Sequence, residues 1–184
     1  QQSEVTLKKN HPHEYSEIES SSNVPLAQEL NFSVSTLSGG QESLLGKYET
    51  EKFPKVLLIS FMAEWCPNCH YEAPILNGIY SAWHNSGFDM IIVAEYSDLD
   101  AWEDRFMRTH GINIPYFLGE LNEKNETLRD NIAHTRIRKL MNDQRIWGVP
   151  LHILIVYGNL KEACFVTGEF KPGTLEQFLK DYIS

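Results

Sequence analysis

Three runs made up almost entirely of apolar residues stand out in the middle and near the end of the chain. Each run is shorter than a typical helix and lacks regularly spaced polar positions, which is typical of a strand covered on both faces of a sheet. The runs are Lys55–Met62, Phe88–Ala94 and Leu151–Tyr157. They predict three buried strands at the centre of the fold.

Two weaker patterns predict further strands. Asn31–Leu37 alternates apolar and polar residues as a half-buried strand does, and the Ser-Gly-Gly at 38–40 predicts a turn after it. Ala163–Thr167 follows a turn at Gly158 and Asn159, so we expect it to form a hairpin with the apolar run before it.

Apolar residues recur at helical spacing between these strands. The expected helices follow Cys69 and cover Leu99–His110, 125–142 and the C-terminal segment from Thr174. Alternating strands and helices that end in a hairpin and a final helix predict an α/β fold, with a central mixed β-sheet flanked by helices.

Residues 1–24 are polar, rich in Ser and Glu, and carry no sustained apolar period. We interpret them as a flexible, solvated N-terminal tail rather than a binding arm. Residues 25–184 are long enough to bury one hydrophobic core, so we expect a single domain there.

Charge and hydropathy exclude several kinds of partner. The formal net charge is −9, which disfavours nucleic acid and anionic lipid because both would repel the protein. No apolar run approaches the roughly 20 residues that span a bilayer. The chain begins at Gln1 without a visible signal segment. It is either a mature chain whose leader or anchor was removed or a trimmed one, and both interpretations stay open.

Cys66 and Cys69 are two of only three cysteines, and they stand two residues apart in WCPNCH. Pro67 is favoured at the first position of a helix, which places Cys66 at the helix's amino end. Unpaired N–H groups and the helix dipole favour the thiolate there. We expect Cys66 to be the attacking thiolate and Cys69, one turn further on, to resolve the mixed disulfide.

The surroundings of this motif resemble the thioredoxin superfamily. Trp65 precedes the first cysteine, Pro74 follows within the same helix, and Gly148-Val149-Pro150 comes directly before the last buried strand. The resemblance implies a thioredoxin-like fold in which Pro150 is cis and packs against the cysteine pair. It also implies that Val149 offers backbone hydrogen bonds to a substrate peptide and that Trp65, Pro67 and Asn68 contact the substrate.

Within the superfamily the chain is most similar to the TlpA/ResA/DsbE-like branch. NFSVSTLSGGQESLL looks like the N-terminal β extension of that branch, and WCPNCHYEAPIL resembles its active-site helix. The stretch between Cys69 and Pro150 is longer than in a minimal thioredoxin, which implies an inserted segment before the cis-proline.

Two acidic positions bear on the chemistry. Ser60 stands where thioredoxin carries a buried acid, which is a departure from that pattern. The branch places an acidic side chain at Glu72, three residues after Cys69. Glu72 either exchanges a proton with Cys69 or is an exposed helical residue, and the sequence leaves both open.

The resemblance implies a thiol–disulfide oxidoreductase that reduces protein disulfides outside the cytoplasm, in the periplasm or anchored to a membrane. Its partners would be protein thiol and disulfide substrates and an upstream thiol donor. We expect a monomer that needs no metal and no cofactor besides the redox-active disulfide Cys66–Cys69.

Other functions use the same residues. The direction of electron flow is open, so an oxidase or isomerase stays an alternative, as does a copper metallochaperone that binds through Cys66 and Cys69. With His70 the motif also reads CxxCH, the attachment signal for c-type haem. Cys164 is expected to be a buried, unpaired thiol in a strand.

Overall fold

The computed structural model describes residues 11–22 and 26–183. Its main sheet has eight strands in the order β2-β9-β8-β5-β6-β7-β3-β4, and β1 and β10 form a small second sheet. The strands are β1 (Tyr15–Ser16), β2 (Glu19–Ser22), β3 (Ser33–Ser35), β4 (Gln41–Ser43), β5 (Val56–Met62), β6 (Phe88–Ala94), β7 (Tyr116–Leu118), β8 (Leu151–Val156), β9 (Glu162–Thr167) and β10 (Glu169–Phe170). The helices are α2 (Leu26–Leu30), η1 (Gly46–Glu49), α3 (Pro67–Trp83), α4 (Leu99–Trp102), η2 (Glu103–Arg108), α5 (Glu126–Arg129), α6 (Ala133–Leu140) and α7 (Thr174–Ile183).

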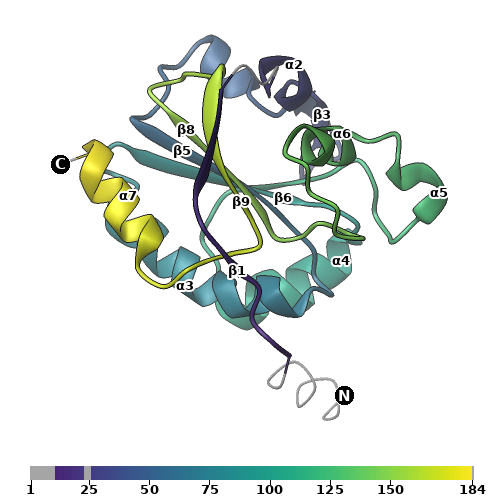
Figure 1. Ribbon diagram of the computed structural model, residues 1–184. Helices are drawn as coiled ribbons and strands as arrows, with labels where there is room; N and C mark the ends of the chain where they lie inside the picture. The colour runs from purple at the N-terminus through teal and green to yellow at the C-terminus, as the bar shows by residue number, and fades with distance from the viewer. Residues whose placement is uncertain (1–10, 23–25, 184) are drawn as a thin grey trace.

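The three apolar runs form the centre of the sheet, as predicted. β5 pairs in parallel with β6 and antiparallel with β8, so the sheet is mixed. Every residue of β5 is buried because helices cover both faces: α3 and α7 lie on one side, and α2 and α6 lie on the other (Figure 1). The predicted hairpin of β8 and β9 is confirmed.

The N-terminal β extension is also confirmed. β3 pairs antiparallel with β4 and touches β7, which places this hairpin at one edge of the main sheet. In the turn between β3 and β4, the Gly39 N–H donates a hydrogen bond to the Thr36 carbonyl at 3.0 Å.

The flexible tail that the sequence analysis predicts for residues 1–24 is wrong for residues 11–22. β1 pairs in parallel with β10, and β2 pairs antiparallel with β9 at the other edge of the main sheet. β2 reads Glu-Ser-Ser-Ser, and its pairing depends on backbone hydrogen bonds that leave no apolar pattern in the sequence. The rest of the predicted tail lies outside the described residues.

The single helix predicted over 125–142 is two helices, α5 and α6. Ile132 between them is extended, with φ −98° and ψ 159°, and its side chain is buried. The next N–H, that of Ala133, donates to the Glu120 carboxylate at 2.7 Å. A tertiary contact therefore starts α6 where local propensity would have continued the first helix.

Candidate active site

Cys66 lies where strand β5 has ended and helix α3 begins. It is the N-cap residue of α3, with extended backbone, and Pro67 follows at the first helical positions. The Cys66 sulfur accepts a hydrogen bond from the Cys69 N–H at 3.2 Å. Because this N–H has no partner within the helix, the sulfur satisfies it, and the same N–H stabilises a thiolate.

Cys69 is fully buried on the first turn of α3. Burial raises the pKa of the Cys69 thiol well above its usual value; a hydrogen bond to Cys66 and the Cys66 charge add to this, and the Glu72 charge adds less. Cys69 is therefore protonated at neutral pH, and it must give its proton to a neighbour before it can attack a disulfide.

The loop before β8 faces the cysteine pair. The peptide bond between Val149 and Pro150 is cis, which is the conformation that the resemblance implies. The Cys66 thiol donates a hydrogen bond to the Val149 carbonyl, with a sulfur–oxygen distance of 3.6 Å. Residues that stand 83 positions apart thus meet at one point, with Cys66 between the start of a helix and the cis-proline loop.

Glu72 is buried, so it is not an exposed helical residue. One carboxylate oxygen lies 2.6 Å from Nε2 of His152 on β8, and the other accepts the Phe170 N–H at 2.9 Å. The other ring nitrogen of His152, Nδ1, lies 2.7 Å from the Ser60 hydroxyl on β5. The sequence analysis missed His152, although a histidine inside an apolar run must find polar partners once it is buried.

Trp65 forms part of an aromatic surface beside Cys66. Its indole N–H donates to the Tyr96 carbonyl at 2.9 Å, and its ring lies 5.9 Å from that of Trp147. The Lys124 ammonium lies 3.8 Å from the centre of the Trp65 ring, within the range of a cation–π contact. Lys124 and Trp147 belong to residues 120–147, the inserted segment before the cis-proline, which therefore borders the candidate site.

Asn68 is buried beneath the N-terminal segment. Its amide donates to Glu169 at 2.8 Å and to the Pro12 carbonyl at 3.1 Å. The Glu169 carboxylate also accepts the Glu14 N–H at 2.7 Å and lies 2.9 Å from Nδ1 of His13. Pro67, by contrast, is half-buried. Residues 12–14, which the sequence pattern assigns to a tail, thus cover Asn68, one of the two residues between the cysteines.

Two buried polar groups hold the inserted segment in place. The Glu95 carboxylate, directly after β6, accepts the N–H groups of Glu120 and Leu121 at 3.3 and 2.7 Å. Burial raises the pKa of Glu95 to about 7, although these backbone hydrogen bonds oppose the rise.

The second buried group is His134 on α6. Its ring forms hydrogen bonds with the Tyr96 hydroxyl at 2.9 Å and with the Gly148 carbonyl at 3.0 Å. His134 therefore supports the cis-proline loop.

The folded protein is expected to lose stability in acid because of His134. Burial, with Arg138 nearby, lowers the pKa of His134 to about 3, whereas an unfolded histidine titrates near pH ~6.5. Below pH ~6.5 the unfolded state binds a proton at His134 that the folded state does not. The contribution of His134 to the free energy of unfolding is therefore complete above pH ~6.5, and it falls by up to about 5 kcal/mol as the pH decreases to ~3.

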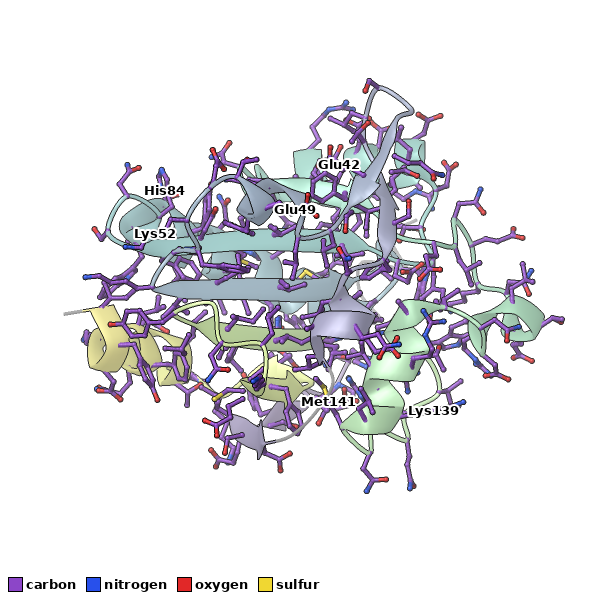
Figure 2. All side chains as sticks on the ribbon, turned by 90° about the horizontal axis from the view of Figure 1, so that it is seen from above. Glu42, Glu49, Lys52, His84, Lys139 and Met141 are labelled. Carbon is purple, nitrogen blue, oxygen red and sulfur yellow. The ribbon has the colours of Figure 1, made fainter. Side chains whose placement is uncertain are left out.

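This expectation is tested by the free energy of unfolding of wild type and His134→Gln, measured by chemical denaturation across that pH range. The variant's profile should be flatter. Glu95 titrates in the opposite sense, but it is present in both proteins and cancels in the difference. His84→Gln is the matched control, since His84 is exposed and lies beside Lys52 at the surface (Figure 2). Equal slopes for wild type and His134→Gln would refute the assignment.

The contacts of His70 bear on the haem alternative. Both ring nitrogens of His70 have hydrogen-bond partners, His110 at 2.8 Å and the Glu64 carbonyl at 2.5 Å, which does not suit an axial haem ligand. Within residues 11–22 and 26–183, no group of three or more His, Cys, Asp or Glu side chains is placed to hold a metal ion. Cys164 is a free thiol, as expected, but it is half-buried.

A family model described as Redoxin matches residues 28–138, which is more than half of the chain. No curated protein matches its sequence. One similar solved structure is a thiol:disulfide interchange protein of the thioredoxin family from Chlorobium tepidum TLS. The two sequences are 22% identical, and the match covers 83% of this chain and 93% of that chain, with a TM-score of 0.58.

Two further structures are similar. The thioredoxin domain of a thiol-disulfide oxidoreductase from Bacteroides vulgatus is 18% identical, with 89% of this chain and 99% of that chain covered and a TM-score of 0.58. A secreted Mycobacterium tuberculosis disulfide oxidoreductase homologous to E. coli DsbE is 17% identical, with 82% and 93% covered and a TM-score of 0.52. At these identities the structures show a shared thioredoxin-like fold. The family model shows that the chain belongs to the Redoxin family.

Proposed function

We propose that this protein reduces disulfide bonds in other proteins outside the cytoplasm, using Cys66 and Cys69. The observation that carries the proposal is the position of the Cys66 sulfur. It lies at the start of α3, accepts the Cys69 N–H, and is 3.6 Å from the carbonyl of Val149 in the cis-proline loop. A thiolate there is stabilised by the helix, and the loop offers backbone groups to an extended substrate peptide.

The reaction proceeds in two exchanges. The Cys66 thiolate attacks one sulfur of the substrate disulfide, and the other substrate sulfur leaves with the electron pair of the broken bond. Cys69 then gives up its proton and attacks the Cys66 sulfur, which forms the Cys66–Cys69 disulfide and releases the second substrate thiolate. Glu72, whose charge acts on Cys69, accepts that proton.

The oxidised pair must be reduced again, so an upstream thiol donor is part of the proposal. We propose that the protein needs no cofactor besides its own Cys66–Cys69 disulfide and that it acts as a monomer. The extracytoplasmic location draws support from the structural likeness to a secreted disulfide oxidoreductase. Among the described residues, no helix is long and apolar enough to cross a membrane.

The reduction potential of the Cys66–Cys69 pair tests the direction of electron flow. The pair in a Cys164→Ser background is equilibrated with glutathione buffers, and the oxidised fraction is read by thiol alkylation and mass. A reductant requires a potential below about −220 mV, whereas a strong oxidant lies near about −120 mV. Insulin reduction by the same protein is the companion assay. A potential near that of the oxidants would replace the reductase proposal by the oxidase alternative.

A further inference from the structure

His152 is the second residue of β8, a strand that is otherwise apolar. It is fully buried, as is its neighbour Ser60 on β5. A buried imidazole without partners is strongly destabilising, yet each ring nitrogen has a partner on a different element. Nδ1 lies 2.7 Å from the Ser60 hydroxyl and Nε2 lies 2.6 Å from the Glu72 carboxylate.

For a neutral imidazole ring and an ionised Glu72, one arrangement of protons satisfies both contacts. The Ser60 hydroxyl donates to Nδ1, which leaves Nε2 with the hydrogen that it donates to Glu72. The second oxygen of Glu72 accepts the Phe170 N–H at 2.9 Å. The carboxylate is therefore held at both oxygens, by a side chain of β8 and by the backbone of β10.

This carboxylate lies one helical turn after Cys69, whose thiol must lose a proton for the second exchange. A cavity of about 180 Å³ borders Glu72 and provides space for water through which that proton can leave. The charged and titratable groups around Glu72 are Cys66 and Cys69 on α3, His152 on β8, Glu169 on β10, and His13, Tyr15, Lys171 and Glu176 across the cavity.

We propose that His152 is a positioning residue, which fixes the Glu72 carboxylate beside Cys69 so that Glu72 can take the Cys69 proton as the mixed disulfide is resolved. The inference rests on the proposed thiol–disulfide exchange. In the step concerned, the Cys69 S–H bond breaks and its proton passes to Glu72. A bond forms between the two cysteine sulfurs, and the substrate thiolate leaves with the electrons of the broken disulfide.

The charge of Glu72 has two opposite effects on this step. It raises the pKa of Cys69, which slows attack, and it accepts the proton, which speeds it. The charge effect is the smallest of the named influences on Cys69, whereas a well-placed proton acceptor contributes roughly 10²-fold or more. The acceptor effect therefore dominates, and a displaced Glu72 should slow the resolution by Cys69.

A two-phase assay separates the steps. The reduced protein, in a Cys164→Ser background, is mixed with an excess of a coloured aromatic disulfide in a stopped-flow instrument. The first phase is the release of one aromatic thiolate when Cys66 attacks the disulfide. The second phase is the release of the other aromatic thiolate when Cys69 resolves the mixed disulfide. His152→Leu is expected to slow the second phase roughly tenfold at neutral pH and to make its rate rise more steeply with pH. The first phase should stay within about twofold of wild type.

His152→Gln is the matched variant, because its amide nitrogen can still donate to Glu72. It should restore most of the second-phase rate, and His152→Leu combined with Glu72→Gln should be no slower than Glu72→Gln alone. An unchanged second phase in folded His152→Leu would overturn the inference, as would equal slowing of both phases. If His152→Leu does not fold, Ser60→Ala provides the same test with a smaller expected effect. A wild-type protein that releases no thiolate would instead refute the proposed function.

Discussion

Cys66→Ser is expected to abolish insulin reduction, whereas Cys69→Ser should retain the first exchange and accumulate a covalent adduct with its substrate. Loss of an attacking nucleophile lowers turnover by at least roughly 10³-fold, because a serine hydroxyl does not ionise at neutral pH. Cys66 is 3% exposed, whereas Cys69 is fully buried. Only Cys66 can therefore meet a substrate, and only Cys69 is close enough to release it.

Intact-protein mass spectrometry measures the second half of this prediction. Cys69→Ser incubated with a disulfide-bonded peptide should gain the mass of one peptide thiol, and a reducing agent should remove it. Cys164→Ser is the control, because the third thiol lies on β9 outside the pair and its replacement should leave turnover unchanged. Adduct formation by Cys66→Ser through Cys69 would reverse the assigned roles, and unimpaired insulin reduction by Cys66→Ser would sink the mechanism.

The centre of the fold could be predicted because burial on both faces leaves a local mark. Phe88–Ala94 is apolar except for Asp89 and is strand β6 with the same limits. The start of α3 was equally visible, since a proline after Cys66 favours the first helical turn. Cys66, Cys69 and Pro150 were placed by motifs whose spacing follows from the thioredoxin-like fold that they resemble.

The residues that surround the cysteines could not be found in this way. Asn68 and Glu169 stand 101 positions apart, and neither belongs to a pattern that extends beyond its own segment. Backbone groups of Pro12 and Glu14 complete their contacts, and backbone groups carry no residue-specific signal. Polar residues near the chain's start therefore predict a tail, and long-range pairing alone brings them to the site.

His152 was missed for another reason. It lies within a run that is otherwise apolar, and such a run predicts a buried strand without singling out one of its residues. A buried polar group needs partners, and Ser60 is the partner that lies opposite His152 on the paired strands β5 and β8. The sequence alone does not show that the two residues are opposite each other, because the register of the strands becomes known only with the sheet.

Gly148→Ala is expected to destabilise the fold and to disturb the site. Gly148 has a φ of +63°, and a Cβ there would lie 1.8 Å from Nε of Arg138. Arg138 cannot easily move aside, because it is buried and is bound to Asp143 at 3.2 Å and to the Arg145 carbonyl. The clash would push the chain directly before Val149, whose carbonyl contacts Cys66.

Gly111→Ala separates the two causes of this effect. Gly111 has nearly the same backbone conformation, with a φ of +59°, and no atom lies within 4 Å of a Cβ built there. The free energy of unfolding of Gly111→Ala should fall by only about 1 kcal/mol, the cost of a Cβ at this backbone conformation, and insulin reduction should be unchanged. The free energy of unfolding of Gly148→Ala should fall by about 3 kcal/mol or more, and most of the insulin-reducing activity should be lost. Chemical denaturation and the insulin assay measure both losses. Equal stability of the two variants would show that Arg138 yields, and that the cis-proline loop does not depend on the close approach of Gly148 to its side chain.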